Sequence, residues 1–201
     1  MQLIEKYLRF TNSSMLLILS NLVAIGLAVW EHWNLPTIMW LYWWQSVTIG
    51  IFNFFRILKV KDISTEGLLI NGKPAEPTKK TQRYIAFFFL AHYGGFHLAY
   101  MIFLFFMTIT NTIQQIDIKW LLFAGLVFFG NHLFSFFSNY SKDEGKQNIG
   151  RMMFFPYARI LPMHLTIIFG NWMIGSTATL IFFMVLKTIA DLIMHLVEHK
   201  E

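Results

Sequence analysis

The 201-residue sequence contains no cysteine. A chain without thiols forms no disulfide bond, no thiolate metal site and no cysteine nucleophile, so any bound metal must rest on nitrogen and oxygen ligands. Two hydrolase motifs are also absent, because the sequence has neither HExxH nor a serine within GxSxG. These absences exclude thiol chemistry and the hydrolase classes that carry those motifs.

Charged residues are scarce as well, at 13% of the sequence, whereas 56% of the residues are hydrophobic and 18% are aromatic. With a mean hydropathy of +0.51, this is not the composition of a soluble globular protein. The formal net charge of +5 comes from lysines and arginines in the connections between apolar segments, and these do not form the separate basic surface of a nucleic-acid-binding protein. The composition predicts a membrane protein whose partner is the lipid bilayer, and it leaves the substrate and a homo-oligomeric state open.

Six apolar segments reach the length of about 20 residues that crosses the hydrocarbon core of a bilayer. The first follows Lys6 and Arg9, as in a signal peptide, but it is long enough to span and no small-residue cleavage motif follows it. The sequence therefore predicts an all-α fold, a polytopic bundle of six transmembrane helices within one integral membrane domain, residues 1–201. The predicted spans are 13–33, 37–58, 83–109, 118–139, 155–173 and 177–198.

The distribution of positive charge predicts the orientation of these helices. Lysines and arginines precede the first segment, flank the second and fourth connections and end the chain, whereas Lys119 alone lies in an odd-numbered connection. Because cytoplasmic loops carry the excess of Lys and Arg, both termini are expected inside. The tryptophans fall near the outer ends of the segments, which agrees with this orientation.

Prolines mark local features of the predicted helices. Pro36 and Pro156 fall at helix starts, where a missing N–H costs nothing. Pro162 lies inside the fifth predicted helix and is expected to kink it close to His164. The connection 59–82 contains Gly, Pro and mixed charge, so we expect an inner loop or a short interfacial segment there.

Several ionisable residues share one predicted depth in the membrane. Counted at 1.5 Å per residue, each lies roughly 12 to 14 Å from the inner boundary. Such residues are expensive in hydrocarbon and mark functional sites by default. They are His92, His132, His164 and Asp191.

The sixth segment adds a stripe on one helix face. Lys187, Asp191, His195 and His199 recur every four residues, so they point the same way from the helix. Histidine nitrogen and aspartate oxygen are ligands of zinc and similar divalent cations, and three protein ligands plus a water form the catalytic pattern.

The first hypothesis for the function is therefore a metal-dependent intramembrane hydrolase. In it His132, His164, Asp191 and His195 hold zinc or another divalent cation, which activates a bound water. Lys187 or His92 would be catalytic, stabilising charge or moving protons.

Two alternatives use the same residues. A proton- or cation-coupled transporter would use them as a relay, and a non-catalytic membrane interaction protein would use them only to orient helices. In the structural alternative the histidines form hydrogen bonds between helices and Asp191 neutralises Lys187. His97 is expected to be a packing or hydrogen-bonding residue, because its five-residue spacing from His92 does not place the two side by side.

The last two segments also carry a resemblance. The sequence PYARI followed by PMHLTIIFG, and then LKTIADLIMHLVEH, resembles an uncharacterised family of small polytopic integral membrane proteins of bacteria and archaea, a domain of unknown function. The resemblance covers most of the chain, including WWQSVTIGIFNFFRIL, in which Gln45 stands where many relatives are expected to have Glu. It implies a prokaryotic cytoplasmic membrane protein and supplies no activity.

The predicted topology can be tested by cysteine accessibility, because the chain has no native cysteine. A cysteine introduced at Asn148 is expected inside, so an impermeant thiol reagent added to intact cells should not label it. Labelling from outside would show that the N-in, C-in orientation is wrong.

Overall fold

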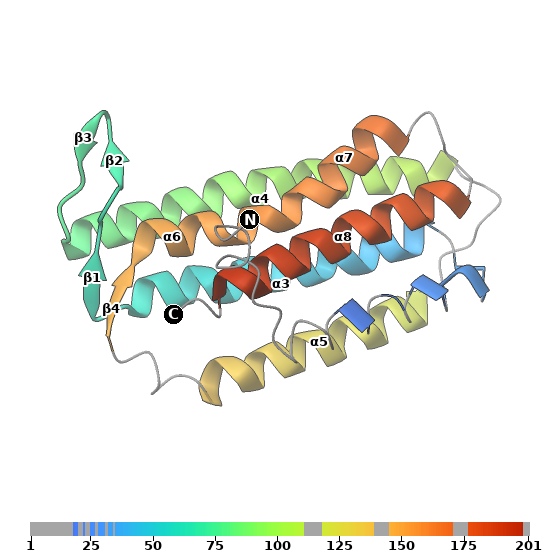
Figure 1. The fold of residues 1–201 in the computed structure, drawn as a ribbon, viewed down its shortest axis with the longest axis horizontal. Helices are drawn as coiled ribbons and strands as arrows, with labels where there is room; N and C mark the ends of the chain where they lie inside the picture. Colours follow the sequence, from blue (N-terminus) through green and yellow to red (C-terminus); the bar gives the residue numbers. More distant parts are fainter. Residues whose placement is uncertain are drawn as a thin grey trace, which may run out of the picture. The chain divides into compact units, whose positions relative to one another are not determined.

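The computed structural model describes residues 35–110, 118–138, 145–170 and 177–198, together with isolated positions between residues 18 and 33. These residues are mostly helical (Figure 1). The helices are α3 (Leu35–Lys59), α4 (Lys79–Thr110), α5 (Ile118–Ser138), α6 (Ile149–Phe154), the 3-10 turn η1 (Phe155–Arg159), α7 (Ile160–Gly170) and α8 (Thr177–Glu198).

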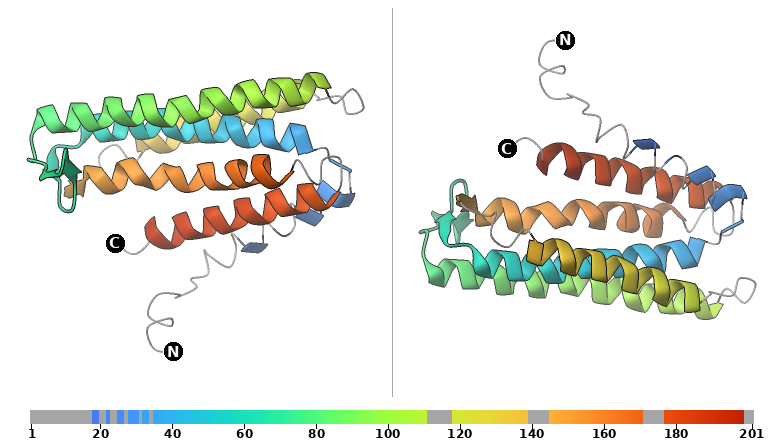
Figure 2. Two further views of the ribbon diagram at one scale, coloured as in Figure 1. Left: turned by 90° about the horizontal axis from the view of Figure 1, so that it is seen from above. Right: turned by 90° about the horizontal axis from the view of Figure 1, so that it is seen from below.

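The chain divides into two compact units, which are described separately. The long-helix unit comprises Pro36–Tyr157, and the C-terminal unit comprises Ala158–Glu201 together with Met1–Leu35. In the long-helix unit α3 and α4 run side by side (Figure 2). In the C-terminal unit α7 packs against α8.

Five of the six predicted apolar segments coincide with helices to within a few residues, except that the fifth begins as η1 before α7. The predicted segment 13–33 falls mostly outside the described residues. Of the described helices, α4 is long and apolar enough to cross a bilayer by length and composition. The structure therefore confirms a mostly helical fold and the position of most segments.

The prediction of an all-α fold is wrong in one detail, because the described residues include four short strands. They are β1 (Asp62–Ser64), β2 (Leu69–Ile70), β3 (Lys73–Pro74) and β4 (Lys146–Asn148). Strands β2 and β3 form an antiparallel hairpin whose two-residue loop is Asn71–Gly72, both with positive φ (50° and 75°). Asn-Gly is the favoured loop of such a hairpin, so the sequence carried a signal for this turn.

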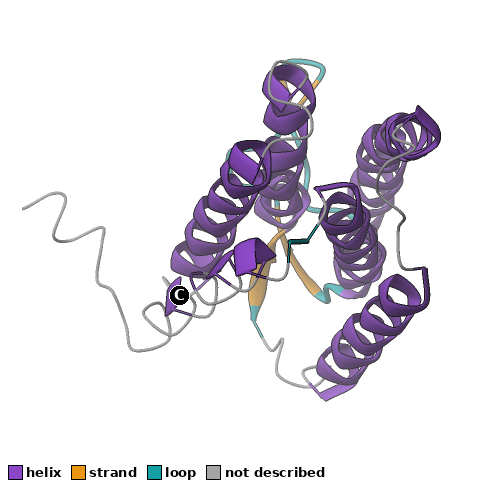
Figure 3. Cartoon of the chain, turned by 90° about the vertical axis from the view of Figure 1, so that its right-hand side faces the viewer, coloured by secondary structure: helices purple, strands orange, loops and turns teal. Residues whose placement is uncertain are grey.

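Strands β1 and β4 pair in parallel, with Asp62 opposite Lys146. Figure 3 shows these strands as a small sheet beside the helices. The side chain of Asn148 reinforces the pairing, since its Nδ2 donates to the Glu66 carbonyl at 2.9 Å and its Oδ1 accepts from the Arg151 N–H at 3.0 Å. The second and fourth connections, both predicted inside, therefore lie at one end of the long-helix unit.

Pro162 lies inside a continuous helical stretch, which changes from the 3-10 helix η1 to α7 at Ile160. The kink expected close to His164 stays a prediction. Pro156 is the second residue of η1, so it lies at the start of a 3-10 helix and not of an α-helix.

The facing sides of α3 and α4 are joined by polar side chains. Trp43 Nε1 donates to the His97 carbonyl at 2.8 Å. Gln82 Nε2 donates to the carbonyls of Ile57 at 2.7 Å and Val60 at 2.9 Å, which satisfies backbone oxygens at the end of α3. Between these levels Gly50 leaves room for the ring of Tyr93, because a Cβ on Gly50 would lie 2.5 Å from Tyr93 Cε1.

Replacement of Gly50 by alanine should therefore destabilise the protein. The added methyl must displace the Tyr93 ring, and overpacking of this kind typically costs about 1–3 kcal/mol. Thermal unfolding in detergent measures the loss. Gly94→Ala is the matched control, since nothing lies within 4 Å of its Cβ and alanine gains helix propensity there. Equal stability of the two variants would contradict the packing argument.

Candidate functional site

Three charged side chains meet in the C-terminal unit. Asp191 on α8 lies 2.7 Å from Lys187 through Oδ2 and Nζ, one helical turn earlier. Its other oxygen, Oδ1, lies 3.2 Å from the Nη2 atom of Arg159 in η1. The side chains are 10% (Asp191), 23% (Lys187) and 14% (Arg159) exposed. We call this group the ion cluster.

The geometry of the ion cluster follows from helix periodicity and burial. Lys187 and Asp191 are four residues apart, which places them on one helix face. The pairing predicted for these two residues is confirmed. The contact with Arg159 was not predicted, although an arginine in PYARI next to an apolar helix could have been recognised as a cation in need of a partner.

The ion cluster limits what Asp191 can bind. Both carboxylate oxygens already face a cation, so a divalent metal at this carboxylate would have to displace an ammonium or a guanidinium group and would be repelled by both.

The other predicted metal ligands are distributed over both units. His164 is exposed on α7, and His195 follows Asp191 by one turn on α8 while its side chain lies outside the described residues. His132 belongs to α5 of the long-helix unit, where its ring is 4.4 Å from that of Phe128. Within the described part of the chain, no three His, Asp or Glu side chains gather as metal ligands do. Their convergence on zinc stays a prediction.

His92, predicted as catalytic, has its partners within the long-helix unit. Its Nδ1 lies 2.8 Å from the Tyr157 hydroxyl, and its ring stacks on Phe88 at 5.4 Å between centroids. The side chain is exposed. The structure thus assigns His92 a hydrogen bond to η1, and its catalytic role stays a prediction.

A buried polar network in the long-helix unit was only partly predicted. His97 is 5% exposed and Ser46 is 2% exposed. His97 Nδ1 lies 2.8 Å from the Tyr93 carbonyl, and Nε2 lies 2.8 Å from Ser46 Oγ. The expectation of a hydrogen-bonding His97 is confirmed, while its partners on α3 could not be known without the helix rotations.

Hydrogen-bond directions in this network follow from the chemistry of its groups. A carbonyl only accepts, so Nδ1 of His97 carries the proton, and in the neutral ring Nε2 then accepts from the Ser46 hydroxyl. Ser46 Oγ in turn accepts from the Tyr93 hydroxyl, 2.7 Å away. Every member has a partner, and the network joins α3 to α4.

Comparison with known families gives one result. A model of a family of unknown function, DUF6498, matches residues 5–201. The chain belongs to this family. The predicted resemblance to an uncharacterised family is thereby confirmed. No curated protein and no solved structure gave a match.

Membership of DUF6498 assigns no activity, so the chemistry of the ion cluster and of the polar network must be argued from the residues themselves. Of the two, the ion cluster holds formal charges in an apolar setting, where an unpaired charge is most costly. It is the stronger candidate for the functional site.

Replacing Asp191 alone should destabilise the protein more than replacing Asp191 and Lys187 together. Asp191→Asn leaves two cations without their shared carboxylate, and breaking a buried pair in this way costs about 3 kcal/mol. The double variant Asp191→Asn with Lys187→Met removes one of those cations and should recover part of the loss. Additive losses in thermal unfolding would show that the two residues are not coupled.

Proposed function

We propose that this DUF6498 chain is an integral protein of a prokaryotic cytoplasmic membrane, with six transmembrane helices and both termini inside. We propose further that the ion cluster is the intramembrane relay of a proton- or cation-coupled transporter. The observation that carries the transport proposal is one carboxylate held between two cations on an apolar helix pair.

Membrane insertion is supported by large exposed apolar faces and by several buried polar side chains in the long-helix unit. A soluble protein buries apolar residues and exposes polar ones, so buried polar groups beside large exposed apolar faces are informative. On α3 and α4 the buried polar residues are Ser46, Thr48, Asn53, Gln82 and His97. Exposed apolar residues on α4 and α5 include Leu98, Ile102, Phe105, Phe106, Ile109, Leu126, Val127 and Phe134, each at least 49% exposed.

This distribution is what a bilayer favours. Lipid solvates the apolar faces, while hydrogen bonds and small residues hold helices together, since burial of apolar surface gives little association energy in lipid. The parallel pairing of β1 with β4 supports the topology as well, because it brings the second and fourth connections to one end, as an up-and-down bundle requires.

The transport proposal follows from the ion cluster. Charged residues inside a membrane segment are rare and mark ion or proton pathways. Lys187 Nζ is 2.7 Å from Asp191 Oδ2, so in the proposed relay these two groups form one hydrogen-bonded step. His195, one turn further along α8, would continue the same face toward the inner end.

Proton movement through the relay can be measured in proteoliposomes that contain a pH-sensitive dye. A potassium diffusion potential, negative inside, should drive acidification of vesicles that hold the wild-type protein. The double variant Asp191→Asn with Lys187→Met should abolish this acidification, because the carboxylate of the relay is gone. The double variant is used because it leaves fewer unpaired charges in the ion cluster than Asp191→Asn alone.

Asp62→Asn is the matched control, since Asp62 is an exposed carboxylate on β1 of the other unit, and it should leave the flux unchanged. Acidification no faster than in protein-free vesicles would contradict the relay. Stoichiometric zinc in the purified protein would also contradict the relay if His164→Ala and Asp191→Ala each lowered the zinc content and His97→Ala did not. That result would favour the metal-dependent hydrolase.

A further inference from the structure

The end of the long-helix unit that carries the strands is strongly basic. Residues 56–83 and 145–151 contain nine lysines and arginines but only three carboxylates, which are Asp62, Glu66 and Glu76. All nine cationic side chains are exposed. We call them the basic collar: Arg56, Lys59, Lys61, Lys73, Lys79, Lys80, Arg83, Lys146 and Arg151.

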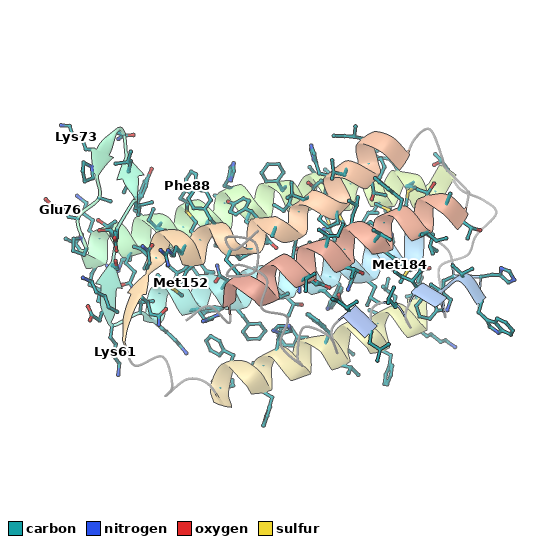
Figure 4. The ribbon with its side chains drawn as sticks, viewed as in Figure 1. Lys61, Lys73, Glu76, Phe88, Met152 and Met184 are labelled. Carbon is teal, nitrogen blue, oxygen red and sulfur yellow. The ribbon has the colours of Figure 1, made fainter. Side chains whose placement is uncertain are left out.

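The fold gathers the collar from three separate parts of the chain. Parallel pairing of β1 with β4 places Lys146 opposite Asp62, the residue after Lys61. Lys79 Nζ donates to the Val60 carbonyl at 2.7 Å, which ties the start of α4 to the end of α3. Lys61 and Lys73 point away from the helices in Figure 4. The collar is therefore a surface formed by several helices and strands, and it is not confined to one charged loop.

Large exposed apolar side chains adjoin the collar on each helix that reaches it. On α3, α4 and α6 an exposed aromatic residue stands within four positions of a collar cation. These residues are Phe55 (44% exposed), Tyr84 (53%), Phe87 (58%) and Phe154 (64%). The change from apolar to cationic surface thus occurs at the same end on all three helices, as expected where helices leave hydrocarbon for the headgroup layer.

The β2–β3 hairpin adds an exposed apolar residue next to the collar. Leu69 is 62% exposed, and on the paired strand Lys73 lies opposite Ile70, the residue after Leu69. A leucine beside lysines is the pattern of a segment that rests in the membrane interface.

We propose that the basic collar binds the anionic headgroups of phospholipids in the inner leaflet. The proposal rests on the membrane insertion proposed above. Clustered Lys and Arg on the cytoplasmic side of membrane helices attract anionic lipid. The exposed aliphatic side chains nearby, such as Leu69 and Leu90, favour lipid over nucleic acid, because lipid supplies a phosphate and hydrocarbon side by side.

The test uses the full-length protein in detergent, titrated with an equimolar mixture of phosphatidylglycerol and phosphatidylcholine, with the bound lipids counted by native mass spectrometry. We expect a several-fold preference for phosphatidylglycerol that falls as salt is raised. The variant Lys61→Gln, Lys73→Gln, Lys146→Gln should lose most of this preference. Lys119→Gln, which removes an exposed lysine near the start of α5, is the matched control and should keep it.

Equal binding of the two lipids by the wild-type protein, or an unchanged preference in the triple variant, would overturn the proposal. Binding of a short RNA that is lost in the triple variant, without any lipid preference, would also overturn it in favour of nucleic acid. Flotation with vesicles at high salt distinguishes failure of the collar proposal from failure of the membrane-insertion proposal. A chain that floats without lipid preference refutes only lipid binding by the collar. A chain that does not float refutes membrane insertion as well.

Discussion

The constraint on which the structure depends is that a polar group surrounded by apolar side chains must find a partner within the protein. In hydrocarbon or in a dry core, an unmet hydrogen bond or an unpaired charge costs more than most packing contacts return. The chain meets this constraint with hydrogen bonds in the long-helix unit and with ion pairs in the C-terminal unit. Both solutions join residues that are far apart in the sequence. In the long-helix unit Ser46 on α3 contacts His97 on α4, and in the C-terminal unit Arg159 in η1 contacts Asp191 on α8.

The two solutions differ in what they can do chemically. In the network of Ser46, Tyr93 and His97 every group has a hydrogen-bond partner, and the arrangement holds two helices in register. In the ion cluster the carboxylate of Asp191 is shared between two cations, so partners can be exchanged without leaving Asp191 unpaired. For this reason we propose a structural role for the network and the relay for the ion cluster.

The sequence predicted the helices well, because long apolar runs bounded by Lys, Arg, Pro and Gly depend only on local composition. It also predicted the Lys187–Asp191 pair, since four-residue spacing on a helix fixes which side chains meet. It did not predict the Arg159 contact or the partners of His97, because these depend on how each helix is rotated about its axis. The β2–β3 hairpin was overlooked although Asn71–Gly72 is a strong turn signal, and the β1–β4 pairing joins residues too far apart in sequence for any local pattern to show.

We propose that lipid covers the large exposed apolar faces of α4 and α5. The most direct test is extraction of membranes from cells that express the full-length chain with alkaline carbonate, which releases proteins held only at the surface. We predict that the chain stays in the pelleted membranes and dissolves only in detergent. Release into the carbonate supernatant as a folded protein would contradict the account.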